Sequence, residues 1–484
     1  MADRRRDDHH SATSPGFVPG EAAPVPWLRV VPVGLGMSVV PLDTAVNIAF
    51  PDITRDFALV LPMIQWVVIC YMLTHAGLML AFGRAGDIWG HAKVFRAGLA
   101  WSGLAFLLCA AAPSFGWLLL FRGLQGIGAG LIISCAPALV TSLYPEARRG
   151  QALGLFTLVF ALGSALGPLL GGLLAARWGW PGVFWFRAPI ALGALALLRE
   201  QPLPAASHLG ERFDVPGAAL LALGLGSLLL ALNALAHTGS HTAAARSTVA
   251  MLLAAIAVAG LGGFVWWEAR ASHPMLRLDL FRNRRFAAIN IAAVLLNLAS
   301  FSVLLFAPYF FDRFGALPLP LAGAVLGAGF VGMAAASPAA GWMLARIPAD
   351  RLAATGALAA GVGLFLVGRW QTDTAPLAMG LTLALQGWGI GLFQVAYMEA
   401  VMAGAGVADR GVAGSLSMMT RTLGVIIAAA MLSLAFAAIE GIAAARGGGA
   451  DAAFLAAFSV IFRGAGAAAG MIGVLIALTA RARR

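Results

Sequence analysis

Long apolar runs follow one another through this chain almost from end to end. Many of them last about 20 residues or more, the length that an α-helix needs to cross the hydrocarbon core of a bilayer. The strands of a membrane barrel read instead as alternating segments of roughly ten residues. Only 11% of the 484 residues are charged and 60% are hydrophobic, whereas about 25% are charged in soluble domains. The sequence therefore predicts an all-α polytopic membrane protein.

Turn and polar signals between the runs divide them into about 14 transmembrane helices. The first six are expected near 27–51, 63–83, 94–112, 116–141, 151–176 and 182–198. Two more are expected near 215–236 and 248–267. The last six are expected near 286–311, 320–345, 350–369, 376–404, 412–438 and 454–480.

This grouping predicts two six-helix halves joined through an extra helix pair. The predicted parts are a disordered cytoplasmic tail (1–26), an N-terminal half (27–198), a linker with the extra pair (199–285), a C-terminal half (286–480) and a basic tail (481–484). Two similar halves are typical of transporters, which bind their substrate between internal repeats. The link lengths favour a peripheral position for the extra pair.

The net charge of +11 is explained by membrane topology. Arginines cluster at 4–6, 148–149, 282–285 and the closing RARR, which all fall on one side if both chain termini are cytoplasmic. The positive-inside rule describes this distribution. We therefore expect cytoplasmic termini and a lipid bilayer as partner, and we do not expect nucleic-acid binding. The three cysteines are separated inside apolar runs, which predicts neither a disulfide framework nor a metal site.

Asp43 interrupts the first apolar run, and Asn47 follows one helical turn further on. An ionised carboxylate inside hydrocarbon is costly unless it is paired, hydrated or protonated. Arg122 lies inside the fourth run, about five residues or roughly 8 Å from its outer end. We expect Arg122 to face a cavity or an anion, and snorkelling of its long side chain to the interface is the alternative.

Two glycine patterns predict tight turns and close helix contacts. The loop after the second run, GRAGDIWGHAKVF, contains Gly83 and Gly90 for a turn, with Asp87 and Lys93 available for ion pairs. In the fifth run, GSALGPLLGG, small residues recur every four positions along one helix face, which lets another helix approach closely. The residues of this second pattern are Gly163, Gly167 and Gly171, with Pro168 as a site for a kink.

These segments resemble the signatures of the major facilitator superfamily. The loop resembles its Gly-x-x-x-Asp-Arg-x-Gly-Arg-(Lys/Arg) signature, with non-basic residues at 88 and 91. LLFRGLQGIGAG around Arg122 resembles the fourth-helix motif, and the glycine face of the fifth run resembles the antiporter motif. LDTAVNIAFPDI, FDVPG and DRGVAGSLSMMTRTLGV resemble the fourteen-helix drug/proton antiporter branch.

The resemblance implies a major facilitator fold in a bacterial cytoplasmic membrane, as a multi-pass monomer. In that fold the first and fourth helices line a central cavity, so Asp43 and Arg122, at similar estimated depth, are expected to interact in proton coupling. Glu399 and Arg421 fall toward the inner ends of their spans and are expected to form a second opposite-charge pair. This pair is a candidate for proton coupling, and a purely structural role for Glu399 is equally well supported.

Other polar and aromatic side chains inside the spans are candidates for the wall of a substrate cavity. They are Asn47, Trp66, Tyr71, His75, Arg187, Asn297, Gln394 and Tyr397. A lone intramembrane histidine is more often a hydrogen-bonded packing residue, and a single aromatic more often faces lipid or the interface. Arg187 stands where the branch usually has asparagine. It would contact either an anionic group of a substrate or, more simply, a carbonyl at a helix end.

The sequence and its resemblance predict a proton-coupled secondary active transporter. It would export small amphipathic compounds by alternating access, driven by the proton gradient and without a cofactor. The alternatives are an exporter of one specific metabolite and a proton symporter for uptake on the same fold. An enzyme is not expected, because the sequence contains no HExxH, GxSxG or cysteine–histidine cluster, and no GxxxxGK[ST] phosphate loop indicates ATP hydrolysis.

Overall fold

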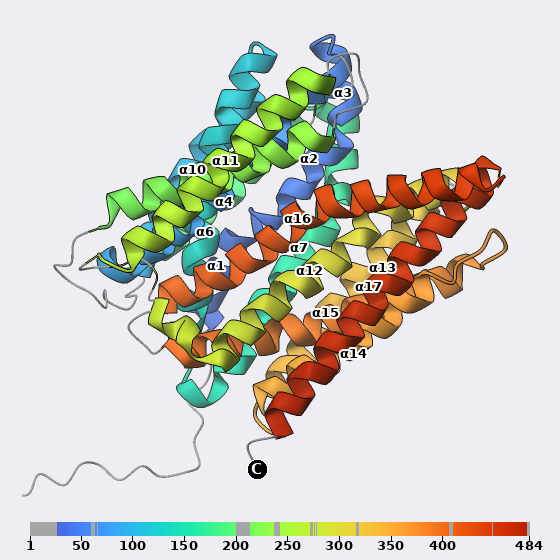
Figure 1. The fold of residues 1–484 in the computed structure, drawn as a ribbon. Helices are drawn as coiled ribbons and strands as arrows, with labels where there is room; N and C mark the ends of the chain where they lie inside the picture. The colour runs from blue at the N-terminus through green and yellow to red at the C-terminus, as the bar shows by residue number, and fades with distance from the viewer. Residues whose placement is uncertain are drawn as a thin grey trace, which may run out of the picture.

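The computed structural model of the chain describes residues 27–59, 63–64, 66–199, 213–236, 243–271, 274, 276, 278–315, 319–405, 410–447 and 449–481. Every regular element within these ranges is helical. The helices form two lobes, one from each half of the chain (Figure 1). The tail predicted at 1–26 lies outside the described residues, as do residues 482–484 of the basic tail.

The first lobe and the extra pair contain the following elements. They are α1 (Trp27–Ser38), η1 (Pro41–Thr44), α2 (Ala45–Ile48), α3 (Phe50–Asp56), α4 (Trp66–Trp89), α5 (His91–Ala110), α6 (Phe115–Ser142), η3 (Glu146–Arg148), α7 (Arg149–Trp178), α8 (Gly182–Trp185), α9 (Arg187–Arg199), α10 (Val215–Ala236) and α11 (Ala243–Glu268). The second lobe contains η4 (Leu278–Arg282), α12 (Arg284–Phe310), η5 (Phe311–Gly315), α13 (Leu319–Met343), α14 (Ala349–Val367), α15 (Pro376–Ala405), α16 (Arg410–Ala445) and α17 (Ala450–Arg481).

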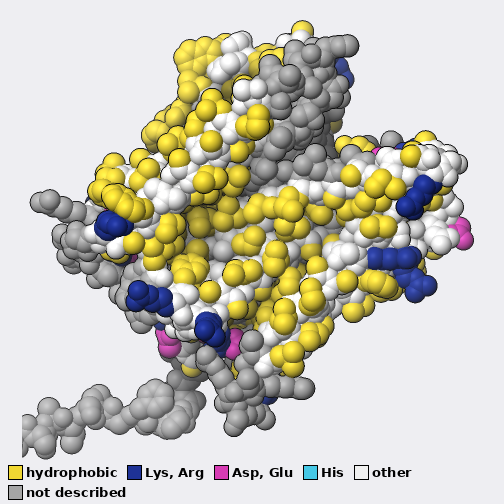
Figure 2. All heavy atoms as spheres, in the orientation of Figure 1, with side chains coloured by type: hydrophobic (Ala, Val, Ile, Leu, Met, Phe, Trp, Pro, Cys, Tyr) yellow, Lys and Arg dark blue, Asp and Glu magenta, His cyan; other side chains and the backbone are white. Residues whose placement is uncertain are grey.

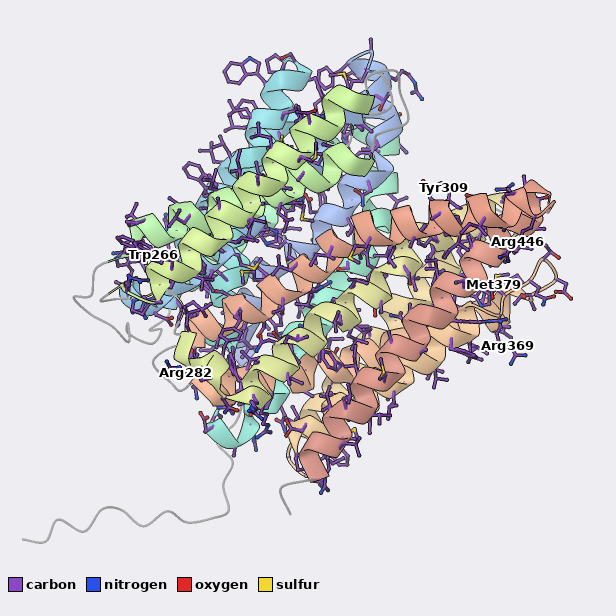
Figure 3. All side chains as sticks on the ribbon, viewed as in Figure 1. Trp266, Arg282, Tyr309, Arg369, Met379 and Arg446 are labelled. Atoms are coloured by element: carbon purple, nitrogen blue, oxygen red, sulfur yellow. The ribbon has the colours of Figure 1, made fainter. Side chains whose placement is uncertain are left out.

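The surface of the two lobes has the character of a membrane protein. Within the described residues, 12 helices are long and apolar enough to cross a membrane, and α10 adds a shorter apolar stretch, Val215–Ala231. Figure 2 shows a largely hydrophobic surface, with lysine and arginine gathered toward its ends. The exposed Trp266 and Tyr309 lie toward opposite ends, as interfacial aromatics do (Figure 3). The all-α polytopic class is confirmed, while the count of fourteen and the side of the termini stay predictions.

The first membrane segment, predicted near 27–51, is present as an apolar span over Val30–Asn47, and its helix is broken near the centre. After α1 the chain passes through the 3₁₀ turn η1 before α2 and α3 begin. Pro41 opens this turn and has no backbone N–H to continue the hydrogen bonds of a helix. Asp43 therefore lies in the break, where the local geometry differs from that of a regular helix.

The glycine face of α7 packs directly against this break. A Cβ added to Gly163 would lie 2.7 Å from Pro41 Cγ, and one added to Gly171 would lie 2.7 Å from the carbonyl oxygen of Ala45. Between them, a Cβ at Gly167 would collide with Thr44 Oγ1. The predicted close-contact face is confirmed, and its partner is the segment that holds Asp43.

The extra helix pair lies against the first lobe and reaches the second. α10 packs on α4, where the Cβ of a residue replacing Gly77 would lie 3.4 Å from Ala222 Cα. α10 also contacts α16 of the second lobe, and α11 packs on α10. The pair thus lies outside the two lobes but touches both (Figure 1).

The lobes meet at the end where α1 begins and α17 ends, called the termini end below, and diverge at the opposite end (Figure 1). At the meeting end, α7 and α13 approach so closely that a Cβ on Gly154 would lie 2.6 Å from the carbonyl oxygen of Ser337. At the other end, a buried apolar cluster around Val46, Val67 and Phe184 has only first-lobe members. Figure 2 shows a notch between the lobes there. The structure is therefore closed at the termini end and open at the other.

The contact between α7 and the break predicts a stability difference between two glycines. Gly171→Ala should lower the apparent melting temperature in detergent, because the added methyl meets backbone atoms of Ala45 at 2.7–2.8 Å, an overpacking cost of about 1–3 kcal/mol. Gly193→Ala is the control, since nothing lies within 4 Å of a Cβ there. Equal melting temperatures for the two variants would contradict this packing.

Candidate functional site

Asp43 is held by Arg122 through two parallel hydrogen bonds. Arg122 Nη1 donates to Asp43 Oδ1 at 2.8 Å, and Nη2 donates to Oδ2 at 2.9 Å. Arg122 Nε donates to the carbonyl oxygen of Val67 at 2.9 Å. Such a fork of donors matches an ionised carboxylate in both distance and plane. The predicted meeting of Asp43 and Arg122 is confirmed.

A second arginine binds the same carboxylate. Arg187 Nη1 donates to Asp43 Oδ1 at 2.6 Å. Arg187 opens α9, directly after the short helix α8, so its segment is broken as the segment of Asp43 is. The counter-ion of Arg187 is Asp43 rather than a carbonyl at a helix end, so that alternative is wrong, while a contact with an anionic substrate group stays a prediction.

The cluster is buried and carries an excess of positive charge. Arg122 and Arg187 are 1% and 0% exposed. Their guanidinium groups lie 4.5 Å from the Tyr71 ring centre and 4.4 Å from the Phe106 ring centre, respectively. One carboxylate against two guanidinium groups leaves a net charge of +1. Arg187 Nε and Nη2 have no hydrogen-bond partner among the described residues.

Two features of the cluster correct or extend the sequence prediction. The snorkelling alternative for Arg122 is wrong, because its head group points into the protein rather than to the interface. Gln125 belongs to the cluster although it was not predicted: its Nε2 donates to Asp43 Oδ1 at 2.8 Å, and its Oε1 accepts from Arg122 Nη1 at 2.8 Å. Its position one helical turn after Arg122 is the signal that would have identified it.

Ion pairs join the two lobes at the termini end. Arg149 Nε, at the start of α7, donates to Glu399 Oε2 at 2.8 Å across the lobe boundary. In a second pair the arginine belongs to the second lobe and the acid to the first: Arg410 Nη2, at the start of α16, donates to Glu146 Oε2 at 2.7 Å. The predicted pair between Glu399 and Arg421 is wrong, because Glu399 lies beside the basic start of α7.

The signature loop also contributes to this closure. Gly90 has a φ of 93°, a left-handed conformation that glycine adopts readily, and forms the turn between α4 and α5. Asp87 is fully buried, and its Oδ2 accepts a hydrogen bond at 3.0 Å from the backbone N–H of Val412 in the first turn of α16. The carboxylate thus satisfies an amide at a helix N-terminus of the other lobe. Lys93 is exposed.

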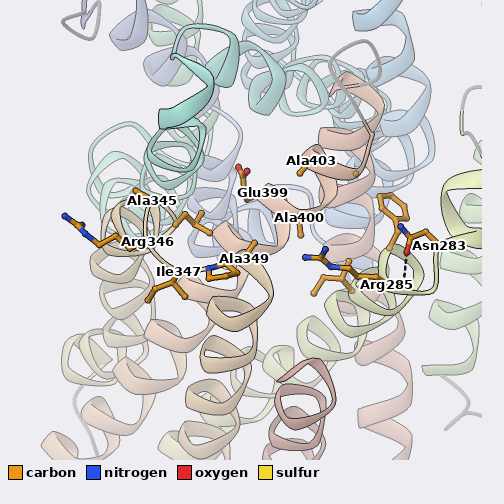
Figure 4. Close-up of a pocket in the computed structure, with 14 residues that line it drawn as sticks. Asn283, Arg285, Ala345, Arg346, Ile347, Ala349, Glu399, Ala400 and Ala403 are labelled. Carbon is orange, nitrogen blue, oxygen red and sulfur yellow. Dashed lines mark hydrogen bonds between the residues drawn. The ribbon is translucent and has the colours of Figure 1, made fainter. Parts of the chain in front are cut away.

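A pocket of about 480 Å³ opens beside these inter-lobe pairs (Figure 4). It lies between the start of α12, the link from α13 to α14 and the end of α15. Arg285, Arg346 and Glu399 are among its lining residues. Arg285 is itself paired with Asp350, at 3.1 Å between Nε and Oδ1. The pocket therefore belongs to the polar surface at the termini end.

A second, smaller cavity of about 120 Å³ lies within the second lobe. It is formed by α12, α13, α15 and α16, and the predicted residues Asn297, Gln394 and Arg421 all line it. Phe160 of α7 covers Arg421 from the first lobe, with 4.1 Å between the guanidinium carbon and the ring centre. Sequence reasoning thus identified three residues of this cavity but assigned Arg421 the wrong partner.

The other predicted cavity residues are spread over different environments. His75 is buried, and neither of its ring nitrogens has a hydrogen-bond partner within the described residues, so the packing role through a hydrogen bond is wrong. Tyr397 is fully buried, and its hydroxyl donates to Asn290 Oδ1 at 2.8 Å. Asn47 and Trp66 are exposed.

Comparison with known proteins identifies a family and its relatives. A family model described as the Major Facilitator Superfamily matches residues 33–429. The chain is 29% identical over 413 residues to the multidrug resistance protein Stp of Mycobacterium tuberculosis, covering 85% of this chain and 76% of the relative. It is 31% identical to the puromycin resistance protein pur8 of Streptomyces alboniger (84% and 81% covered). It is 26% identical to the riboflavin transporter RibZ of Clostridioides difficile (85% and 88%).

Solved structures show the same fold at low sequence identity. The human organic anion transporter MFSD10 matches with a TM-score of 0.64 and 17% identity, over 94% of this chain and all of the other. The proton:xylose symporter XylE matches with a TM-score of 0.59 and 17% identity, over 93% of this chain and 94% of the other. The resemblance noted in the sequence motifs is confirmed at the level of the family and the fold.

The charge balance of the Asp43 cluster predicts a compensating pair of substitutions. Asp43→Asn leaves two buried guanidinium groups without a counter-ion, and breaking a buried pair costs about 3–5 kcal/mol. Adding Arg187→Gln restores the net charge of +1, so the double variant should regain part of the lost melting temperature. Asp52→Asn is the control, because its partner Arg55 is exposed. Additive losses in the double variant would contradict this account.

The inter-lobe ion pairs predict a change in accessibility. In a cysteine-free background, Ser415→Cys places a thiol where the Ser415 hydroxyl now donates to the Ser134 carbonyl across the lobes at 3.3 Å. Glu399→Gln should accelerate maleimide labelling of this thiol several-fold, since a partly exposed ion pair contributes on the order of 1 kcal/mol. Asp350→Asn, which breaks a pair inside one lobe, should leave the rate unchanged. The same rate in both variants would show that the Glu399 pair does not hold the lobes together.

Proposed function

We propose, because this chain belongs to the major facilitator superfamily, that it exports small amphipathic molecules across the bacterial cytoplasmic membrane in exchange for protons. The family carries small molecules through membranes, and Stp and pur8 are both named as resistance proteins. Resistance by transport requires movement out of the cytoplasm. The glycine face of α7, which resembles the antiporter motif, supports the same direction.

The observation that carries the proposal is the double arginine contact of Asp43. Both oxygens of the carboxylate accept hydrogen bonds, three of them at Oδ1. Protonation of Asp43 would remove the negative charge that attracts these four donor groups. Protonation therefore changes the packing of the break between α1 and α2, against which α7 lies. A proton at one residue is in this way converted into a movement of helices.

The rest of the site supplies the mechanical parts of an alternating-access cycle. In the conformation described above, the ion pairs of Glu399 and Glu146 hold the lobes together at the termini end. The arginine-rich composition of this end favours a cytoplasmic location. Rocking of the lobes would break these pairs and close the notch at the opposite end. Glu399 is thus assigned to closure, and Asp43 with Arg122 and Arg187 to proton coupling.

Transport by everted membrane vesicles tests the proposal. Vesicles containing the wild-type protein should accumulate at least one of puromycin, riboflavin and naphthalene-1-acetate when a proton gradient is applied, and a protonophore should abolish the accumulation. Asp43→Asn should reduce it to the level of vesicles without the protein, because the switch no longer titrates. Asp52→Asn, a carboxylate exposed at the surface, should retain transport.

Two results would contradict the proposal. The first is accumulation that persists when the protonophore is present, since transport would then draw on another energy source. The second is full proton-driven accumulation by Asp43→Asn, which would show that another residue couples transport to protons. Uptake in right-side-out vesicles with the same proton dependence would instead identify a symporter.

A further inference from the structure

We propose that the cavity around Arg421 binds a carboxylate group, so that the transported molecules are amphipathic monoanions or zwitterions. The inference rests on the proposed transport function and names the substrate class that the second lobe accepts. It is carried by the side chains that line one cavity, by their unused hydrogen-bond donors and by the charge of the protein interior.

Two donors of residues that line this cavity have no acceptor among the described residues. Gln394 Nε2 and Ser300 Oγ are buried and without a hydrogen-bond partner there. Asn297 and Gln386 line the same cavity and are also buried. A buried donor left without a partner costs about 1–3 kcal/mol. A ligand that brings several acceptor oxygens would recover this cost at two or more sites at once.

Arg421 adds a positive charge that the protein does not balance. Its contact in the structure is the face of Phe160, and the described residues that line the cavity include no carboxylate. Glu399, the predicted partner of Arg421, is occupied by Arg149. Asp43 already binds Arg122 and Arg187. A charged arginine in the membrane interior is expensive, so an anion is the occupant that neutralises it.

The size and charge of the site favour a carboxylate over other anions. A guanidinium fork matches the two oxygens of a planar carboxylate. A single negative charge neutralises Arg421, whereas a phosphate dianion would leave an excess negative charge in an apolar lobe. The cavity of about 120 Å³ is too small for a drug-sized molecule, for which pockets run to about 300–1,000 Å³. It therefore accommodates the head group, and the apolar body extends toward the boundary between the lobes, where Phe160 lies.

The location of Phe160 also explains how binding reaches the rest of the molecule. Phe160 belongs to α7, the helix whose glycine face packs against the break that holds Asp43. A carboxylate that draws Arg421 away from the ring would alter a contact between the two lobes.

The test compares two probes that differ in one group. Naphthalene-1-acetate and naphthalene-1-acetamide are titrated by calorimetry into the purified full-length protein in nanodiscs, at one pH and without a gradient. The wild type should bind the acetate at least tenfold more tightly. Arg421→Gln should weaken acetate binding about 10- to 100-fold and leave acetamide binding unchanged, the effect expected for a lost charge-assisted hydrogen bond. Arg421→Lys should retain part of the preference.

Further variants separate this inference from loss of folding. Gln394→Leu should weaken acetate binding several-fold, and Arg313→Gln, a partly exposed arginine paired with Asp451, should have no effect. Equal wild-type affinities for the two probes, no binding of either, or a preserved preference in Arg421→Gln would overturn the inference. Inorganic phosphate that competes with naphthalene-1-acetate for the site as strongly as the acetate ion does would also overturn it. The titration measures binding without a proton gradient, so it can be interpreted even if the protein does not export molecules in exchange for protons.

Discussion

The contact of one carboxylate with two buried arginines organises the first lobe of this protein. Asp43 lies at a helix break, Arg122 comes from the long helix α6 and Arg187 from the start of α9, so three separate segments meet at a single charge. None of the three ions would be tolerated alone in a membrane interior. Together they remain one positive charge out of balance, and that excess favours the ionised form of Asp43.

The break that places Asp43 depends in turn on the glycine face of α7. Asp43 lies in a 3₁₀ turn that begins at Pro41, not in a regular helix. This turn packs so closely on α7 that the residues of α7 at the contact cannot carry side chains. These residues are Gly163, Gly167 and Gly171. The same helix begins with Arg149, which pairs with Glu399 of the other lobe, and carries Phe160 over Arg421. α7 therefore touches the coupling cluster, the closure at the termini end and the cavity of the second lobe.

Much of this arrangement could be read from the sequence, and the remainder depends on tertiary contacts. Long apolar runs and flanking arginines define the helices because lipid imposes simple rules on length and charge. The similar estimated depths of Asp43 and Arg122 in the membrane correctly predicted that the two residues meet. Depth alone misassigned Glu399 to Arg421, since residues at one level can lie on different helix faces and in different lobes. Arg187 was missed as a partner because a break before α9, invisible in an apolar run, turns it toward Asp43.

Infrared difference spectroscopy of the reconstituted protein tests the central claim most directly, by following the carbonyl stretch of protonated carboxylic acids during acidification. We expect the wild type to show one component of this band that Asp43→Asn lacks, and spin labels on the two lobes at the termini end to separate over the pH range in which that component appears. Identical bands in the wild type and Asp43→Asn, or a lobe separation that Asp43→Asn retains, would contradict the assignment of Asp43 as the proton switch.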